Sequence, residues 1–334
     1  SDISGFRYLV QMLCYESVNG SCPKTIYPLA IRITLYVILG ILVTLTVFGN
    51  FLVIASIAYF KQLHTPTNYL IFSLAVSDLL LGLIVMLPSM IRCVESCWYF
   101  GDVFCKIYMS SDVTLCTASI LNLLCISVDR HYAVCQPLIY SRKITVNVVL
   151  IMILLSWSVS VMIGFGMVYL ELNIWGIEEF FYTHISCVGG CVLFQSGLSS
   201  TVSSVLSFYI PGIVMLSVYL RIFVVAQGQS RRIHITAKIS STGQNKATKT
   251  LAVIMGSFLS FWTLFFVCNI VDPFIGYATP PELFDTLVWI GYLNSTVNPL
   301  IYAFFYSWFR KAFRLFTSVN IFKSDISEMT LFTE

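Results

Sequence analysis

Apolar positions divide the chain into seven long hydrophobic blocks with short polar segments between them. Each block exceeds the roughly 20 apolar residues that a helix needs to cross a bilayer. Backbone N–H and C=O groups in lipid must pair within the protein, and the blocks do not alternate with the period of two expected of a β-barrel. The pattern predicts an all-α membrane protein, a seven-transmembrane helix bundle. The blocks cover residues 33–60, 69–93, 104–135, 146–170, 198–226, 250–275 and 283–306.

Composition excludes a soluble globular domain. Of the 334 residues, 57% are hydrophobic and only 10% are charged, whereas soluble domains have roughly a quarter of their residues charged. No cleavable signal peptide is visible, so we expect the first block to act as its own signal anchor.

The charges are distributed unevenly between the two sides of the predicted bundle. With seven spans, 14 of the 19 Lys and Arg residues fall on one side. The positive-inside rule puts that side in the cytoplasm and the N-terminus outside the cell. Ten acids face five bases on the other side, so we expect an outer surface that attracts cations. The expected location is the plasma membrane.

Asn19 begins an Asn-Gly-Ser sequon in the outer tail and is a candidate glycosylation site. A second sequon, at Asn294, falls within the last block, where glycosylation machinery has no access.

The cysteines indicate outer disulfides without fixing their pairing. We expect Cys116, Cys125, Cys135 and Cys268 to stay reduced. The cysteines in or near outer segments, where disulfides form, are Cys14, Cys22, Cys93, Cys97, Cys105, Cys187 and Cys191.

Three acids, Asp78, Asp112 and Asp129, lie within or at the edge of predicted spans. A charge at the centre of a bilayer costs at least about 2.5–3.5 kcal/mol, and such residues usually face the bundle interior and mark a functional path. The alternative for Asp78 is a buried acid that only holds helices together.

Asp112 has the position expected of a ligand counter-ion. It precedes Arg130 by 18 residues, which is five helical turns or roughly 27 Å, so both side chains leave one helix face near opposite membrane surfaces. Asp112 lies about two turns below the outer end of its helix. A cationic ligand would offset the cost of burying the carboxylate and form a charge-assisted hydrogen bond.

Aromatic and hydroxyl side chains could form the walls of such a pocket. Aromatic faces attract ammonium groups, although aromatic residues at helical spacing can equally be plain bundle packing. Ser203 and Ser207 share one helix face and could bind a polar ring substituent, or they could simply mediate helix contacts. The aromatic candidates are Trp262, Phe265, Phe266, Trp289 and Tyr292.

The motifs of these spans resemble those of rhodopsin-like G-protein-coupled receptors over nearly the whole chain. Within that class, FKQLHTPTN at 60–68, ESCWYFGDVFCK at 95–106 and WFRKAF at 308–313 are similar to segments of the trace amine-associated receptors. HISCVGGC at 184–191 is similar to the subgroup that senses simple primary amines. The class motifs are Gly49-Asn50, LAVSD with Asp78, Asp129-Arg130-His131, Trp157, Pro211, Tyr219, Trp262 and NPLIY at 298–302.

The resemblance implies a role for each matching residue. Asp112 is the amine counter-ion, with Tyr292 bonded to it. Cys105 pairs with Cys187, and Cys22 pairs with Cys191. Asp78, Ser119, Asn294, Ser295 and Asn298 form a polar pocket of the sodium-binding type. Ile120, Pro211 and Phe258 form a packing switch, and Arg130, Tyr219 and Tyr302 rearrange beside Asp129 to admit a G protein.

The resemblance also implies three parts. Residues 1–31 form an extracellular tail and 32–306 the bundle. Residues 307–334 form a basic amphipathic helix on the inner leaflet, followed by a cytoplasmic tail. The implied partners are a small amine, a heterotrimeric G protein of the stimulatory type and the bilayer, with no nucleic acid. No metal or cofactor is expected beyond sodium as an allosteric modulator.

Three positions depart from the receptor pattern. Leu264 stands where the sixth helix usually has Pro, so the usual kink loses its cause. Gln244 replaces a Glu that would pair with Arg130, and Ser307 replaces a Pro. These departures leave open a receptor-like chain that binds amines and signals weakly or not at all.

Alternatives from other protein classes find less support. A transporter would be expected to show internal repeats, and none is visible. A retinal-binding receptor needs a Lys in the last span, but none occurs between Lys249 and Lys311. No catalytic residues of an enzyme are found. The sequence therefore predicts a receptor for small organic amines and does not identify the amine.

Overall fold

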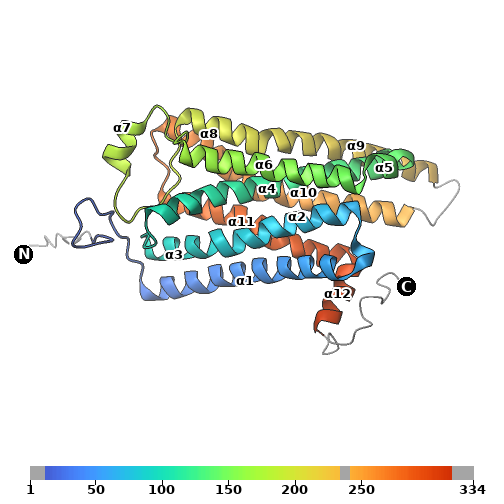
Figure 1. Cartoon of the computed structure of the whole chain (residues 1–334), viewed down its shortest axis with the longest axis horizontal. Coiled ribbons are helices and arrows are strands. Elements are labelled where there is room, and N and C mark those ends of the chain that lie inside the picture. The colour runs from blue at the N-terminus through green and yellow to red at the C-terminus, as the bar shows by residue number, and fades with distance from the viewer. Residues whose placement is uncertain (1–11, 234–240, 318–334) are drawn as a thin grey trace, which may run out of the picture.

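The computed structural model describes residues 12–233 and 241–317, which form a bundle of long, roughly parallel helical columns (Figure 1). Seven such columns lie within these residues, and they confirm the predicted all-α membrane fold. The columns are α1 (Leu29–Tyr59), α2 and α3 (Pro66–Leu80 and Leu87–Glu95), α4 (Asp102–Cys135), α6 (Val146–Tyr169), α8 and α9 (Gly197–Ser204 and Ile210–Ile233), α10 (Ser241–Val271) and α11 (Pro281–Phe305).

Two of the columns are continuous through a widened turn. The π-helical turn Leu81–Met86 joins α2 to α3, and a second one, Val205–Tyr209, joins α8 to α9. Such turns add a residue to the helix and occur often at functional sites. Here the second turn carries Ser207 toward the bundle interior, where its side chain is buried.

Within the described residues, six columns are long and apolar enough to cross a membrane, and α11 is the exception. The middle of α11 carries the polar residues Asn294, Ser295, Thr296 and Asn298, all of them buried. Ser295 and Asn298 donate hydrogen bonds to Asp78 of α2, and Thr296 bonds to Thr46 of α1. These contacts hold the seventh column in the bundle despite its lower hydropathy.

Short connections lie at the two ends of the bundle. One end, called the tail end below, carries the N-terminal tail and α7 (Glu178–Phe180); the opposite end carries α5 (Pro137–Lys143) and α12 (Ser307–Thr317) (Figure 1). Hydroxyl side chains cap helices at these connections: Thr65, Thr145 and Ser196 each accept a hydrogen bond from the backbone N–H three residues on. Such caps satisfy donors that a helix leaves unpaired.

The α12 helix turns away from the bundle axis (Figure 1). Trp308, Phe309 and Ala312 are buried, and Arg310 donates hydrogen bonds to the carbonyl oxygens of Ala303 and Phe304 at the end of α11. The guanidinium thus satisfies acceptors that the helix end would leave unpaired. The amphipathic helix is present where the sequence predicts it.

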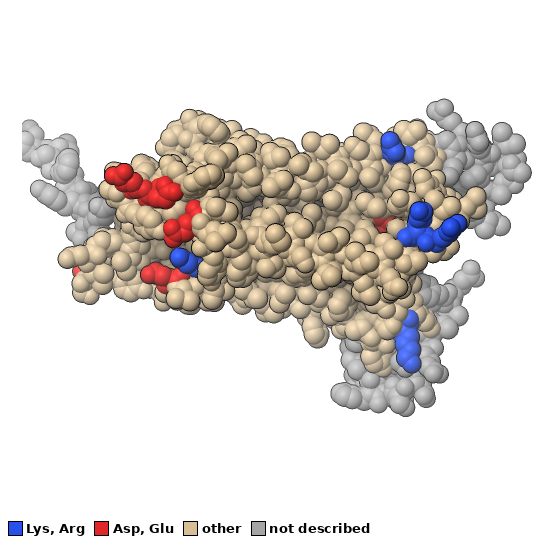
Figure 2. Space-filling model, turned by 45° about the horizontal axis from the view of Figure 1, so that its top comes forward, with Lys and Arg blue, Asp and Glu red and all other residues tan. Residues whose placement is uncertain are grey.

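Figure 2 shows Asp and Glu gathered at the tail end, with Lys and Arg mostly at the opposite end. Three of the few basic residues at the tail end are engaged by acids. The ion pairs of the described residues there are Arg32 with Glu95, Arg92 with Asp285, and Lys106 with Glu171. The charge asymmetry predicted from sequence is therefore a feature of the folded surface.

The predicted disulfide pairing is wrong, although all four predicted cysteines are bonded. The structure joins Cys22 to Cys187 and Cys105 to Cys191, so the partners are exchanged. The cause is backbone pairing between the tail and the loop after η3 (Phe181–Ile185). The Cys22 N–H donates to the Val188 carbonyl and the Val188 N–H donates to the Gly20 carbonyl, each at 2.9 Å. This pairing sets Cys22 against Cys187 and leaves Cys191 for Cys105.

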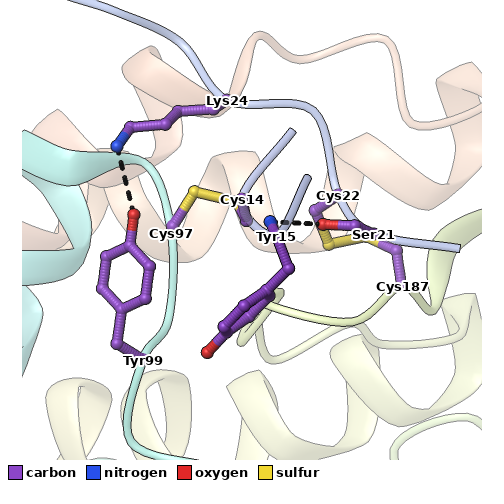
Figure 3. The surroundings of a disulfide bond; sticks show 8 residues. All are labelled: Cys14, Tyr15, Ser21, Cys22, Lys24, Cys97, Tyr99 and Cys187. Atoms are coloured by element: carbon purple, nitrogen blue, oxygen red, sulfur yellow. Dashed lines mark hydrogen bonds between the residues drawn. A yellow bond between two sulfur atoms is a disulfide. The ribbon is translucent and has the colours of Figure 1, made fainter. Parts of the chain in front are cut away.

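A third disulfide, Cys14–Cys97, was not among the predicted bonds (Figure 3). It ties the tail to the connection between α3 and α4. Lys24 supports the same contact through a 3.2 Å hydrogen bond to the Tyr99 hydroxyl (Figure 3). Asn19, the predicted glycosylation site, is exposed in the loop between Cys14 and Cys22.

Candidate ligand-binding site

The Asp112 carboxylate faces the interior of the bundle near the tail end, where it lines two neighbouring cavities. Among the described residues it forms no ion pair, and the side-chain hydrogen bond of normal geometry that it accepts comes from the Cys116 thiol at 3.4 Å. The buried charge therefore lacks a cationic partner within the described part of the chain.

The deeper cavity, called the deep cavity below, has a volume of about 80 Å³ and lies among α4, α8–α9, α10 and α11. Seven of the eight predicted ligand-binding residues line it. They are Asp112, Ser203, Ser207, Trp262, Phe265, Phe266 and Tyr292.

Trp289 is the predicted ligand residue that does not line the deep cavity. Its indole N–H donates to the Cys93 sulfur at 3.3 Å, and its ring packs edge-on against Tyr292 with centroids 5.5 Å apart. Trp289 therefore lies behind Tyr292 and supports it.

The aromatic wall of the deep cavity is a connected set of rings. Trp262 contacts Phe265 and Phe266, both at 5.7 Å between centroids, and it contacts Tyr292 at 6.4 Å. Tyr292 is 1% exposed, and its hydroxyl, close to Asp112, makes no hydrogen bond of normal geometry with the described residues. The Tyr292 hydroxyl and the Asp112 carboxylate therefore offer a ligand two neighbouring polar groups with hydrogen-bonding capacity left over.

The two serines of the fifth column differ in their availability. Ser207 is buried and lines the deep cavity. The Ser203 hydroxyl accepts a 3.1 Å hydrogen bond from the Gln195 amide and donates to the Ser200 carbonyl at 3.3 Å. A ring substituent of a ligand must compete with Gln195 for Ser203.

Sequence reasoning missed several residues that line the deep cavity. Leu193 and Gln195 come from the loop before α8, and the Cys105–Cys191 bond fixes that loop over the cavity. No periodic signal marks loop residues, so only the disulfide pairing could have placed them. The missed lining residues on helices are Val113, Cys116, Thr117, Met167, Asn269 and Val288.

The predicted sodium-type residues form a hydrogen-bonded cluster around Asp78, below the deep cavity. The Asp78 carboxylate accepts from Ser119 at 2.9 Å, from Ser295 at 2.7 Å and from Asn298 at 2.8 Å. Asn294 is buried, and its side-chain carbonyl oxygen has no partner among the described residues. The donor set, a carboxylate with hydroxyl and amide oxygens, fits a hard cation such as sodium.

The predicted packing switch occupies the space between the deep cavity and the opposite end. Ile120 lines the cavity, Pro211 is buried at the start of α9, and Phe258 is 0% exposed. Phe208 connects the two regions, since it stacks on Phe266 at 4.6 Å and contacts Phe258 at 5.6 Å.

At the opposite end, Arg130 is held by its neighbour Asp129. The Arg130 side chain donates two hydrogen bonds to the Asp129 carboxylate, which also accepts from Thr67 at 2.9 Å and from Tyr140 at 2.8 Å. The hydroxyl of Tyr302 has no hydrogen-bond partner among the described residues. The side chain of Gln244 lies outside the described part of the structure.

The α10 helix is unbroken at the position where the resemblance expects Pro. Leu264 is 58% exposed on the lipid-facing side, and α10 continues past it to Val271. The kink expected of this receptor class therefore lacks its usual cause here.

Comparisons with known proteins agree with this arrangement. Residues 49–302 match the family model described as "7 transmembrane receptor (rhodopsin family)". The chain is 48% identical over 332 residues to trace amine-associated receptor 1 of Homo sapiens, covering 96% of this chain and 98% of the relative. It is 47% identical to trace amine-associated receptor 4 of Mus musculus, covering 95% and 94%. It is 43% identical to trace amine-associated receptor 13c of Danio rerio, covering 99% of both.

The matched family consists of multi-pass plasma-membrane receptors, not of enzymes. The chain belongs to the rhodopsin-like G-protein-coupled receptors and, within them, to the trace amine-associated receptors.

Proposed function

We propose that this receptor is activated by small organic amines whose ammonium group pairs with Asp112 in the deep cavity. The observation that carries the proposal is the Asp112 carboxylate, which lines an aromatic cavity and has no cationic partner among the described residues. A ligand ammonium compensates that charge through a charge-assisted hydrogen bond.

The surroundings of Asp112 support an ammonium ligand over other cations. The rings of Trp262, Phe265 and Phe266 surround the cavity, and aromatic faces attract ammonium groups by about 2 kcal/mol or more when desolvated. The Tyr292 hydroxyl supplies an additional polar group beside the carboxylate. The deep cavity, at about 80 Å³, has room for a small amine or for the ammonium end of a longer one.

The tail end faces the outside of the cell in this proposal. Lys and Arg gather mostly at the opposite end (Figure 2), which the positive-inside rule assigns to the cytoplasm. The disulfides at the tail end are then on the oxidising side of the membrane.

Ligand binding favours a minor active state in which Arg130 leaves Asp129 and a heterotrimeric G protein binds at the opposite end. The bonds from Thr67 and Tyr140 to Asp129 allow this, since they still satisfy the carboxylate after Arg130 has moved. Family resemblance supports the stimulatory G protein, with a rise in cyclic AMP as the readout.

The test replaces Asp112 by Asn, which keeps the shape and removes the charge. We expect the Asp112→Asn receptor to reach the cell surface and to lose its cyclic-AMP response to a panel of primary and tertiary amines. The matched control is Asp102→Asn, which removes an exposed acid from the first turn of the same helix. An unchanged response of the Asp112 variant would overturn the proposal.

Sodium as an allosteric modulator is a second part of the proposal. Asp78, Ser119, Ser295 and Asn294 would hold the ion through their side-chain oxygens. We expect the purified receptor to unfold at a higher temperature in sodium chloride than in choline chloride. The Asp78→Asn variant should lose that difference; a difference that persists in the variant would count against sodium at Asp78.

A further inference from the structure

A second, larger cavity lies between the deep cavity and the tail end. This shallow cavity has a volume of about 370 Å³. It shares with the deep cavity the residues Asp112, Leu193, Gln195, Phe265, Asn269 and Val288. Because Asp112 borders both cavities, a ligand anchored there can extend from one into the other.

The lining of the shallow cavity carries an excess of negative charge. Three carboxylates, those of Asp112, Asp272 and Asp285, face it together with one guanidinium, that of Arg92. Arg92 is committed to Asp285 through a 2.5 Å contact between its terminal nitrogen and the carboxylate. This pair is neutral, so Asp112 and Asp272 remain as two negative charges without an ion-pair partner among the described residues.

The Asp272 side chain is held in place by the turn that follows α10. One carboxylate oxygen accepts the backbone N–H of Thr279 at 3.0 Å, and the Asp272 carbonyl accepts the backbone N–H of Tyr277 at 2.9 Å. The other carboxylate oxygen makes no hydrogen bond with the described residues. Asp272 is thus a fixed carboxylate on the wall of the cavity, with one oxygen left for a ligand.

Aromatic rings accompany Asp272 in the same wall. Tyr277 and Phe194 pack with their ring centroids 4.2 Å apart, and both line the shallow cavity. Tyr277 has a φ of 58°, a conformation that is unfavourable for a bulky residue. Its hydroxyl bond to the Gln195 carbonyl at 2.9 Å and its packing against Phe194 hold it there. A carboxylate flanked by fixed aromatic rings has the composition of an ammonium site.

We propose that the shallow cavity is a second ammonium subsite centred on Asp272, and that this receptor prefers long amines with a second positive charge. One ammonium of a diamine or polyamine binds Asp112, the alkyl chain passes Leu193 and Val288, and the distal ammonium binds Asp272 beside Tyr277. This inference rests on the proposed role of Asp112. The Arg92–Asp285 pair lines the same cavity. Because its two charges cancel, it does not repel either ammonium group of the ligand.

The first test varies the ligand on the unaltered receptor. Cells expressing the full chain receive α,ω-diaminoalkanes of increasing length, each beside the monoamine of the same carbon number and beside its singly N-acetylated form. We expect diamines beyond a threshold length to be about tenfold more potent than the matched monoamine, equivalent to about 1.4 kcal/mol. Acetylation of one end should remove that advantage. Diamines that never exceed their monoamines at any length would overturn the proposal.

The second test varies the receptor. Asp272→Asn should remove the advantage of long diamines and leave monoamine potency unchanged, whereas Asp272→Glu should retain most of it. Glu179→Gln is the matched control, because it removes an exposed acid from the tail end without altering the cavity lining. A diamine advantage that survives Asp272→Asn would also overturn the subsite.

The outcomes separate this inference from the proposed function. If monoamines act through Asp112 and diamines gain nothing, only the shallow subsite fails. If Asp112→Asn leaves both classes of ligand active, the counter-ion role fails and the subsite fails with it. An equal loss of monoamine and diamine potency in Asp272→Asn would assign Asp272 a structural role.

Discussion

Gly291 of α11 lies directly against the indole of Trp262 in α10: a Cβ atom on Gly291 would stand 2.6 Å from the ring. Real side chains do not approach this closely, so any larger residue must displace Trp262. The floor of the deep cavity therefore depends on the absence of a side chain at a position that sequence reasoning did not single out.

Gly291→Ala should shrink the deep cavity by pushing Trp262 toward it. Overpacking of this kind costs roughly 1–3 kcal/mol, and we expect lower amine potency together with a lower unfolding temperature. Radioligand binding and thermal unfolding of the purified receptor measure the two effects. Gly256→Ala is the control, since a Cβ there meets no atom within 4 Å. Equal behaviour of the two variants would contradict the packing argument.

Gln195→Ala should change the preference among amines. The substitution releases the Ser203 hydroxyl from its 3.1 Å bond with Gln195. A ligand hydroxyl can then bind Ser203, and one net hydrogen bond is worth about 1 kcal/mol, or roughly fivefold in potency. We expect hydroxylated aromatic amines to gain relative to aliphatic amines of similar size. Dose–response curves for the two classes check this, and a uniform shift of both would show that Gln195 acts only on packing.

Leu264→Pro should alter the maximal response more than amine affinity. Proline inside a helix removes a backbone hydrogen bond and kinks the helix, and Leu264 faces outward, away from both cavities. Leu264→Ala keeps the backbone donor and serves as the control. Binding and cyclic-AMP curves on the same cells compare the two quantities. A large change in affinity with an unchanged maximum would contradict the expected role of the kink.

Peptide mapping without reduction should recover Cys22 linked to Cys187 and Cys105 linked to Cys191. Cys105→Ser should then destabilise the receptor by about 2–5 kcal/mol, the usual cost of losing a native disulfide, and Cys191→Ser should match it. The double variant should cost no more than either single one. A recovered Cys105–Cys187 peptide would favour the pairing that the sequence resemblance implies.

The positions of the helices could be predicted from the sequence, because a helix that crosses lipid needs a long run of apolar residues. The seven hydrophobic blocks agree with the columns to within a few residues at most of their ends, and a lone acid such as Asp112 could be assigned to a cavity because lipid exposure would be too costly. Trp289 shows where this reasoning stops. Its spacing cannot distinguish a cavity wall from the layer behind Tyr292.

Connections between spans obey no such periodicity. Cys187 and Cys191 are only four residues apart, and their partners are decided by tail backbone that pairs with Val188. Gln195 and Asp272 reach the cavities through loop geometry that local composition does not encode. Long-range contacts of loops are therefore the part of the site that requires a structure.

The three disulfides have a joint consequence because they connect in a circuit. Segments 14–22, 97–105 and 187–191 are linked end to end by Cys14–Cys97, Cys105–Cys191 and Cys22–Cys187. The result is a closed covalent hoop at the rim of the bundle. Two of its links run through Cys187 and Cys191, so the hoop restrains the segment that leads into Leu193 and Gln195 of the deep cavity. Once the disulfides have formed, this part of the cavity lining has little freedom to adapt to a ligand.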